Sequence, residues 1–259
     1  MRADIFLFSR GFAKSRSHAA ALIETGVKIC GKRVAKPSQD IPENTAADEI
    51  EIENPSKYVS RGGYKLEGAI EAFSLDVAGM TALDLGASTG GFTDCLLKHG
   101  AKKVYAVDVG HGQLDSSLLS DPRVISIEGV NARELSADMI QDTIDIITCD
   151  LSFISQSLIY APVAKILSED GIFVSLIKPQ FEAGRGNIGR GGIVKDKKVH
   201  TDVINRLFSV SAESGLYPHA LSVSKITGGD GNREYLALFS KKSDGAFVSR
   251  QMIENTVNS

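Results

Sequence analysis

The residues with the clearest chemical potential are the glycines of segment 82–92, which reads ALDLGASTGGF. An apolar run contains Asp84, and three small residues then separate Gly86 from Gly90 and Gly91. This spacing predicts a strand followed by a turn whose backbone approaches a ligand closely, because glycine has no side chain to hold the ligand away. The segment contains neither the dinucleotide fingerprint G-x-G-x-x-G nor the phosphate-binding form G-x-x-x-x-G-K-[ST]. A tight strand-to-helix connection without a ligand remains the alternative.

Charged residues also mark the ends of the apolar runs that follow residue 60. Five such runs alternate with segments of helical periodicity, near residues 83–85, 104–107, 124–127, 144–148 and 172–177. The charged residues at their ends are Asp84, Asp108, Glu128, Asp150 and Lys178. Each alone could be a strand-end cap. Because ligands of parallel sheets bind at the carboxyl ends of the strands, the set predicts a ligand site there.

The remaining elements predict an α/β fold with a mostly parallel sheet and helices on both faces. Before the first strand, Leu66, Ile70 and Phe73 fall on one helix face. Residues 92–97 begin a second helix, and residues 199–208 are typical of a third. Two strands are expected near the C-terminus, the last over residues 235–239.

The D-x-G-x-x-x-G form of the glycine segment resembles that of S-adenosylmethionine-dependent methyltransferases. The resemblance implies a Rossmann-like class I fold in which the glycines approach the methionine and ribose portions of the cofactor. Asp108 would accept hydrogen bonds from both ribose hydroxyls, although an NAD site would also place an acid there. Glu128 or Asn131 would meet the adenine edge, and Asp84 could hold the cofactor's amino group. The expected cofactor set is Asp84, Gly86, Ser88, Thr89, Gly90, Gly91, Phe92, Asp108, Glu128 and Asn131.

The acceptor side has a different pattern from that of enzymes that methylate base amino groups. Those enzymes place Asn or Asp, two prolines and an aromatic residue after the fourth strand, where this chain reads CDLSF. The notable positions here are Lys65 in SRGGYKL, Asp150 in CDLSF, Lys178 in LIKPQFE and Glu234 in NREYLALF. With these motifs the chain resembles the FtsJ-type ribose 2′-O-methyltransferases, and in particular the TlyA family, which joins an alpha-L domain to an FtsJ-like domain. The resemblance covers nearly the whole chain and implies 2′-O-methylation of ribosomal RNA, with cytidine as the expected nucleotide.

The four acceptor-side positions have distinct expected roles. A carboxylate of ordinary pKa ~4 is a poor base for a ribose hydroxyl, whereas a neutral lysine amine is better matched. At pH 7 an unperturbed lysine is neutral about one time in two thousand, which costs ~4–5 kcal/mol. We hypothesise that Lys178 is the base, that Asp150 and Glu234 orient it, and that Lys65 steadies the ribose or phosphate. An electrostatic role alone for Lys178 stays open.

The first 36 residues form a basic block on a chain whose net charge is −3. The block has eight Lys or Arg residues against two acids, whereas residues 40–53 carry six acids and no base. Such a block indicates phosphate binding, with a solvated surface as the alternative. Apolar spacing predicts a short helix closed by Gly11 and a second helix around residues 19–23 that ends at Gly26.

Ser15 or Ser17 is expected to cap the second of these helices, and a tight hairpin and a strand at residues 50–52 should follow. The stretch SRGFAKSRSHAAALIETGVKICGKRV resembles the alpha-L RNA-binding fold of a small-subunit ribosomal protein, some pseudouridine synthases and tyrosyl-tRNA synthetase. The resemblance implies docking on structured RNA through its phosphates. The expected RNA-binding residues are Arg10, Lys14, Arg16, Lys32 and Arg33, with Arg61, Arg185 and Arg190 in the large domain.

The expected organisation is an alpha-L domain at residues 1–55, a linker at 56–60, a methyltransferase domain at 61–242 and a polar, frayed tail at 243–259. The glycine-rich segment 182–196 predicts a loop beside Lys178 that closes over RNA phosphates, or else a flexible surface connection. Three scattered cysteines, no signal peptide and no membrane-spanning run indicate a cytoplasmic protein without a metal site. These features do not support the haemolysin label that part of the TlyA family carries.

Two other functions stay open. The first is a non-catalytic RNA-binding or ribosome-assembly protein on a methyltransferase scaffold, although such a role would not require the four acceptor-side positions. The second is an NAD-linked oxidoreductase, which the missing fingerprint in segment 82–92 disfavours. Because the first predicted helix begins almost at Met1, without an extended N-terminal arm, we expect an RNA methyltransferase of this kind to act at a large-subunit site.

Overall fold

The computed structural model describes residues 1–259 except 14, 53–56, 229–230 and 246. An N-terminal module precedes the gap at 53–56 and a large domain follows it, each with its own hydrophobic core. The expected linker at 56–60 begins in that gap, so its first residue lies outside the described residues.

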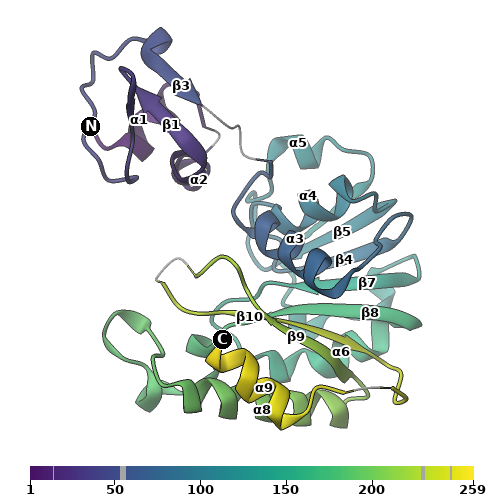
Figure 1. Cartoon of the computed structure of the whole chain (residues 1–259). Helices are drawn as coiled ribbons and strands as arrows, with labels where there is room; N and C mark the ends of the chain where they lie inside the picture. The colour runs from purple at the N-terminus through teal and green to yellow at the C-terminus, as the bar shows by residue number, and fades with distance from the viewer. Residues whose placement is uncertain (14, 53–56, 229–230, 246) are drawn as a thin grey trace.

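The N-terminal module packs two helices on a small antiparallel sheet (Figure 1). In chain order it contains α1 (Ala3–Ser9), α2 (Arg16–Gly26), β1 (Val27–Ile29), β2 (Lys32–Arg33), η1 (Ala47–Glu49) and β3 (Ile50–Ile52), and its strand order is β2-β1-β3. Ser15 caps α2 by accepting a hydrogen bond from the His18 backbone at 3.1 Å. The predicted second helix, hairpin and third strand are confirmed. The alpha-L identification stays a prediction.

The large domain is built on a seven-stranded sheet of order β6-β5-β4-β7-β8-β10-β9. Its parallel strands are β4 (Thr81–Leu85), β5 (Lys103–Asp108), β6 (Val124–Glu128), β7 (Ile144–Cys149) and β8 (Leu167–Ile177). β10 (Tyr235–Ser240) pairs antiparallel with β8 and with β9 (Tyr217–Val223). The strand order reverses at β4, which is where ligands of such sheets bind. The predicted, mostly parallel α/β fold is confirmed.

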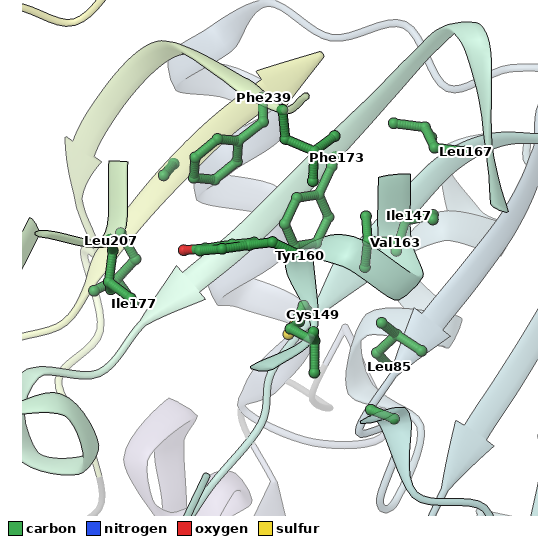
Figure 2. Packing of buried hydrophobic residues seen from close by; sticks show 14 of the residues in the cluster. Leu85, Ile147, Cys149, Tyr160, Val163, Leu167, Phe173, Ile177, Leu207 and Phe239 are labelled. Atoms are coloured by element: carbon green, nitrogen blue, oxygen red, sulfur yellow. The ribbon is translucent and has the colours of Figure 1, made fainter. Parts of the chain in front are cut away.

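Helices cover both faces of this sheet (Figure 1). One face packs against α3 (Gly62–Phe73), α4 (Gly91–Lys98) and α5 (Ser116–Leu119), and the other against α6 (Tyr160–Ile166), α8 (Lys197–Glu213) and α9 (Arg250–Asn258). Figure 2 shows the second core, where the rings of Phe173 and Phe239 stack with centroids 5.4 Å apart beside Tyr160. Short turns in the connections are η2 (Ala132–Glu134), η3 (Ala137–Met139), η4 (Gln156–Leu158), α7 (Pro179–Glu182), η5 (Arg185–Asn187) and η6 (Arg190–Gly192).

The expectation of a frayed tail at 243–259 is wrong for its last part, which is α9. Ser249 caps this helix by accepting a hydrogen bond from the Met252 backbone at 3.3 Å. Ile253 and Val257 are each 1% exposed and pack in the core beneath the sheet. The two residues are four positions apart, so they form one apolar stripe on an otherwise polar helix. Such a short stripe is hidden when only average polarity is considered.

Candidate active site

The glycine-rich turn predicted from the sequence follows β4 and is packed against two other segments. Gly86 has a φ of +80° and Gly90 of +93°, a region that favours glycine. A Cβ on Gly86 would lie 2.7 Å from the backbone oxygen of Asp150. A Cβ on Gly91 would collide with Ser60 Oγ. The turn therefore lies between the loop after β7 and the first residues of the large domain.

A cavity of about 730 Å³ opens beside this turn at the carboxyl ends of β4, β5 and β7. Asp108 ends β5 and lines the cavity; its two carboxylate oxygens accept hydrogen bonds from the backbones of Ser88 at 2.8 Å and Gly110 at 2.7 Å. Val109 and Leu151 add apolar walls. Apolar walls with a few fixed polar groups are typical of small-ligand sites. The residues fit S-adenosylmethionine, since the carboxylate suits a ribose diol and the apolar walls suit adenine.

Most of the other predicted cofactor residues lie around this cavity or next to it, whereas Gly90 packs against Leu114 and Leu118 and lines neither cavity. Asn131 lines it and accepts a hydrogen bond from the Arg133 backbone at 3.1 Å. Glu128 instead borders a neighbouring hollow and accepts one from the Gly112 backbone at 3.0 Å. Of the two candidates for the adenine edge, the structure thus places Asn131 at the cavity. Four more members of the set line a smaller adjoining cavity of about 180 Å³, namely Ser88, Thr89, Gly91 and Phe92.

Asp84 lies beneath the glycine turn and lines neither cavity. Its side chain is fully buried, and it accepts hydrogen bonds from Thr93 Oγ1 at 2.7 Å and Thr148 Oγ1 at 2.9 Å. Through these contacts Asp84 ties α4 to β4 and β7 and supports the turn. Its expected contact with the cofactor's amino group stays a prediction. Burial raises the pKa of Asp84 to about 6, and the nearby charge of Asp150 adds to the rise.

We expect the stability of the wild type, relative to an Asp84→Asn variant, to fall as the pH rises from 4 to 6. Asp84 changes its pKa from 3.8 in the unfolded chain to about 6 in the folded protein. Between these values the folded state binds the extra proton, so raising the pH destabilises it, by at most about 3 kcal/mol. Thermal unfolding of both proteins between pH 4 and 8 measures this difference. A difference that does not change with pH would contradict the expectation.

Lys178 lies at the carboxyl end of β8 and faces the smaller cavity. Its Nζ is 2.5 Å from Asp150 Oδ1 and donates a hydrogen bond to Ser152 Oγ at 2.9 Å. The side chains of Lys178 and Asp150 are 10% and 21% exposed. Because Gly86 and Asp150 line both cavities, the amine lies next to the space assigned to the cofactor. The predicted pairing of Lys178 with Asp150 is present in the structure.

Lys65 and Glu234 form a second, more buried pair. Lys65 Nζ donates a hydrogen bond to Glu234 Oε2 at 2.6 Å, and the two side chains are 11% and 2% exposed. Gln180 donates a hydrogen bond to the other carboxylate oxygen of Glu234 at 3.3 Å. Gln180 follows Lys178 by two residues, so it connects the second pair to the turn that carries the first. Glu234 was expected to orient Lys178, but its side-chain partners are Lys65 and Gln180. The four predicted catalytic residues therefore form two lysine–carboxylate pairs joined through this turn.

The predicted RNA-binding residues that the structure describes are mostly exposed. Lys32 and Arg33 form the exposed strand β2. Arg10 donates a hydrogen bond to a backbone oxygen, and Arg16 pairs with a carboxylate, both inside the N-terminal module. Lys14 lies outside the described residues.

In the large domain, Arg61 immediately precedes α3 and follows Ser60, which lines the smaller cavity. Arg185 and Arg190 are exposed in η5 and η6 of the glycine-rich segment. No structural observation tests the contacts of these residues with RNA, so their role stays a prediction.

The sequence did not point to several residues of the site, among them Ser152, Gln113 and Phe153. Ser152 contacts Lys178, and Gln113 lines the large cavity. Phe153 also lines that cavity; it is 90% exposed, has a φ of +63°, and its ring centroid is 4.8 Å from that of Phe181. An exposed aromatic residue two or three positions after a strand-end Asp is a signal that could have identified Phe153. Within the described residues no helix has the length and apolar character to cross a bilayer.

The fold defines a class I methyltransferase, with paired lysines and carboxylates next to its glycine turn. Residues 58–241 match the model of the FtsJ-like methyltransferase family, and the chain belongs to this family. The expected family, the methyltransferase activity and S-adenosylmethionine as the family's methyl donor are confirmed.

Several relatives are similar over most of their length. Hemolysin A of Brachyspira hyodysenteriae is 45% identical over 241 residues, which cover 92% of this chain and 99% of the relative. The 16S/23S rRNA (cytidine-2′-O)-methyltransferase TlyA of Mycobacterium tuberculosis is 40% identical over 258 residues, covering 99% and 96%. The 23S rRNA (cytidine-2′-O)-methyltransferase TlyA of Campylobacter jejuni is 32% identical over 260 residues, covering 93% and 100%. A structure solved under a hemolysin name from Streptococcus thermophilus has a TM-score of 0.79 at 39% identity, covering 100% of this chain and 94% of that one.

Proposed function

We propose that this protein transfers the methyl group of S-adenosylmethionine to the 2′-hydroxyl of a ribose in ribosomal RNA. The observation that supports this best is the position of Lys178 and Asp150, 2.5 Å apart beside the glycine turn and the large cavity. A ribose hydroxyl is a weak acid, so its methylation requires alignment and removal of a proton. A lysine held by a carboxylate next to the donor cavity offers both functions.

Each of the two pairs has a separate role in this reaction. The bound cofactor supplies an electrophilic methyl group on its sulfonium. Lys178 Nζ, oriented by Asp150 and Ser152, accepts the proton of the 2′-hydroxyl once its own extra proton has been released. Glu234 holds Lys65 through the 2.6 Å hydrogen bond, and Lys65 steadies the ribose or an adjoining phosphate. Burial of this second pair keeps its geometry fixed.

Ribosomal RNA as the substrate is supported by three observations. The N-terminal module holds the basic block, including the exposed strand of Lys32 and Arg33. The exposed ring of Phe153 at the cavity offers a surface on which a base could stack, worth ~1–3 kcal/mol. The relative from Mycobacterium tuberculosis is named a 16S/23S rRNA (cytidine-2′-O)-methyltransferase and that from Campylobacter jejuni a 23S rRNA (cytidine-2′-O)-methyltransferase, so 23S rRNA is common to the two names. We therefore propose a cytidine of large-subunit RNA, free or in a ribosomal subunit in the cytoplasm.

We expect a Lys32→Ala, Arg33→Ala double variant to bind ribosomal RNA about tenfold more weakly at moderate salt. The logarithm of the affinity falls with the logarithm of the salt concentration, and each lost phosphate contact should make this slope less steep by about 1. Titration of RNA at several salt concentrations measures both values. Lys225→Ala, which removes an exposed lysine of the large domain, is the matched control and should leave the slope unchanged. An unchanged slope in the double variant would remove β2 from the RNA interface.

The proposed function is tested by mapping ribose methylation in ribosomal RNA from cells with and without the gene. One 2′-O-methyl mark should disappear in the deletion strain, return with the wild-type gene and fail to return with Lys178→Ala. A deletion strain that keeps every mark would contradict the proposal. If purified protein binds S-adenosylmethionine but methylates neither ribosomal RNA nor subunits, the non-catalytic RNA-binding alternative is favoured.

A further inference from the structure

We infer that Glu182 is a positioning residue of the methyl-transfer site. Its carboxylate holds the loop 150–155, which carries Asp150 and Phe153, against the turn that carries Lys178. The assignment of this site to methyl transfer rests on the proposed function, whereas the contacts of Glu182 do not depend on it. The roles predicted for the four catalytic residues do not involve Glu182.

Glu182 ends α7, the single helical turn that begins directly after Lys178. Its side chain is 1% exposed. One oxygen accepts a hydrogen bond from Ser155 Oγ at 2.7 Å and the other accepts one from the Gln156 backbone at 2.7 Å. Arg206 of α8 donates a third hydrogen bond from Nη2 to Oε2 at 3.0 Å. The two ends of α7 thus contact the two ends of one loop: Lys178 pairs with Asp150, and Glu182 binds Ser155 and Gln156.

A charged carboxylate in this position requires a reason, because a buried charge costs several kcal/mol unless donors satisfy it. Here the donors are a hydroxyl, a backbone N–H and a guanidinium. Charge-assisted hydrogen bonds of this kind are about twice as strong as neutral ones. Because these donors satisfy its charge, the buried Glu182 carboxylate holds together the turn after β8 and the loop after β7, whose contacting residues Glu182 and Gln156 are 26 positions apart in the sequence.

The loop held by Glu182 is hydrogen-bonded to the sheet at both of its ends. At its start, the Asp150 backbone donates a hydrogen bond to the Leu85 carbonyl at 3.0 Å. At its end, the Gln156 side chain donates to the Leu176 carbonyl of β8 at 2.6 Å. Phe153 lies between these points with a φ of +63°, a strained conformation for an aromatic residue that persists only where neighbours impose it.

The loop also forms a wall of the cofactor cavity, which is lined by Asp150, Leu151, Ser152, Phe153, Ile154 and Ser155. Loosening it should therefore move a wall of the cofactor site, the carboxylate paired with Lys178 and the exposed ring of Phe153 together. Cofactor affinity and turnover should both fall. A residue that only stabilised the fold would lower the unfolding temperature and leave both quantities unchanged in the folded protein.

The test uses the fact that the chain contains no tryptophan. A Phe153→Trp substitution places a single fluorophore in the loop, and time-resolved anisotropy then reports the loop's motion. Adding Glu182→Gln, which keeps the shape and removes the charge, should increase the amplitude of fast motion. In the chain with Phe153 intact, Glu182→Gln should weaken S-adenosylmethionine binding by about tenfold and lower kcat by at least tenfold, measured below the unfolding temperature.

Two further variants separate positioning from stability. Ser249→Ala removes the N-cap hydrogen bond of α9, a helix that lines neither cavity, so it should lower the unfolding temperature and keep cofactor affinity within about threefold of wild type. Ser155→Ala removes one donor and should weaken binding by itself, with little further loss when Glu182→Gln is added. Wild-type anisotropy and cofactor affinity in folded Glu182→Gln would overturn the inference. Anisotropy and cofactor binding require no RNA, so failure of the proposed function would appear separately, as wild-type protein that methylates no ribosomal RNA.

Discussion

The Lys178→Arg variant is expected to lose about a thousandfold or more in kcat while its S-adenosylmethionine affinity stays within about threefold of wild type. Arginine keeps the positive charge that faces Asp150 2.5 Å away, but it does not release a proton in proteins. If Lys178 is the base, a positive charge that cannot accept the 2′-hydroxyl proton does not support methyl transfer. Single-turnover methylation of ribosomal RNA, with cofactor binding measured separately, distinguishes the chemical step from binding.

The matched control for this substitution is Lys103→Arg. Lys103 also pairs with a carboxylate, Asp142, at 2.6 Å, but it lies at the start of β5, away from the cavities. Its replacement should leave turnover unchanged within about twofold. Residual turnover above a tenth of wild type in Lys178→Arg would show that Lys178 acts through its charge. Removal of the 2′-hydroxyl proton would then have to be assigned to another group.

The Gly86→Ala variant is expected to weaken S-adenosylmethionine binding by about a hundredfold or more and to lower turnover as well. The new Cβ would lie 2.7 Å from the Asp150 backbone oxygen and 3.0 Å from Leu151 Cδ2. Backbone cannot move aside as a flexible side chain can, so the loop after β7 must shift. That shift changes the cavity wall and the carboxylate opposite Lys178 together. Equilibrium binding of the cofactor and single-turnover kinetics measure the two effects.

Gly79→Ala is the control for backbone strain. Gly79 has a φ of +74°, close to the +80° of Gly86, but a Cβ there would have nothing within 4 Å. Both variants should lose about 1 kcal/mol of stability from the left-handed conformation. Only Gly86→Ala should lose cofactor affinity. Equal cofactor affinities in the two variants would show that the contact with Asp150 does not shape the site.

The general position of the site could be predicted because it depends on the order of apolar runs and on topology. Parallel strands end at the same edge of a sheet, so Asp108, Asp150 and Lys178 had to come close together. The pairing of Lys65 with Glu234 is less local, since 169 residues separate them. The sequence did not predict this pairing, since Glu234 was expected to orient Lys178 and no spacing rule connects a helix before the first strand with the last strand.

The direction of a side chain was harder to predict than its place in the sequence. Asp108 is the last residue of β5, whereas Asp84 is paired with Ala106, two residues before Asp108, and therefore lies deeper in the sheet. There its carboxylate accepts hydrogen bonds from Thr93 and Thr148 beneath the turn. Glu182 was not recognised because a glutamate after a lysine and a proline has no pattern of its own. Its role depends on the loop after β7, which folds back to it only in three dimensions.

Because β10 is synthesised after β8 and then pairs with it, the residues for cofactor binding are complete earlier in synthesis than those for methyl transfer. Every residue that lines the two cofactor-side cavities lies within the first 178 residues, and so do Lys65, Asp150 and Lys178. Glu234 enters the sheet only when β10 pairs with β8. Since chains emerge from the ribosome N-terminus first, a nascent chain that ends after β8 already contains the donor-binding residues. It lacks the partner of Lys65, so methyl transfer would be acquired only after the sheet has been completed.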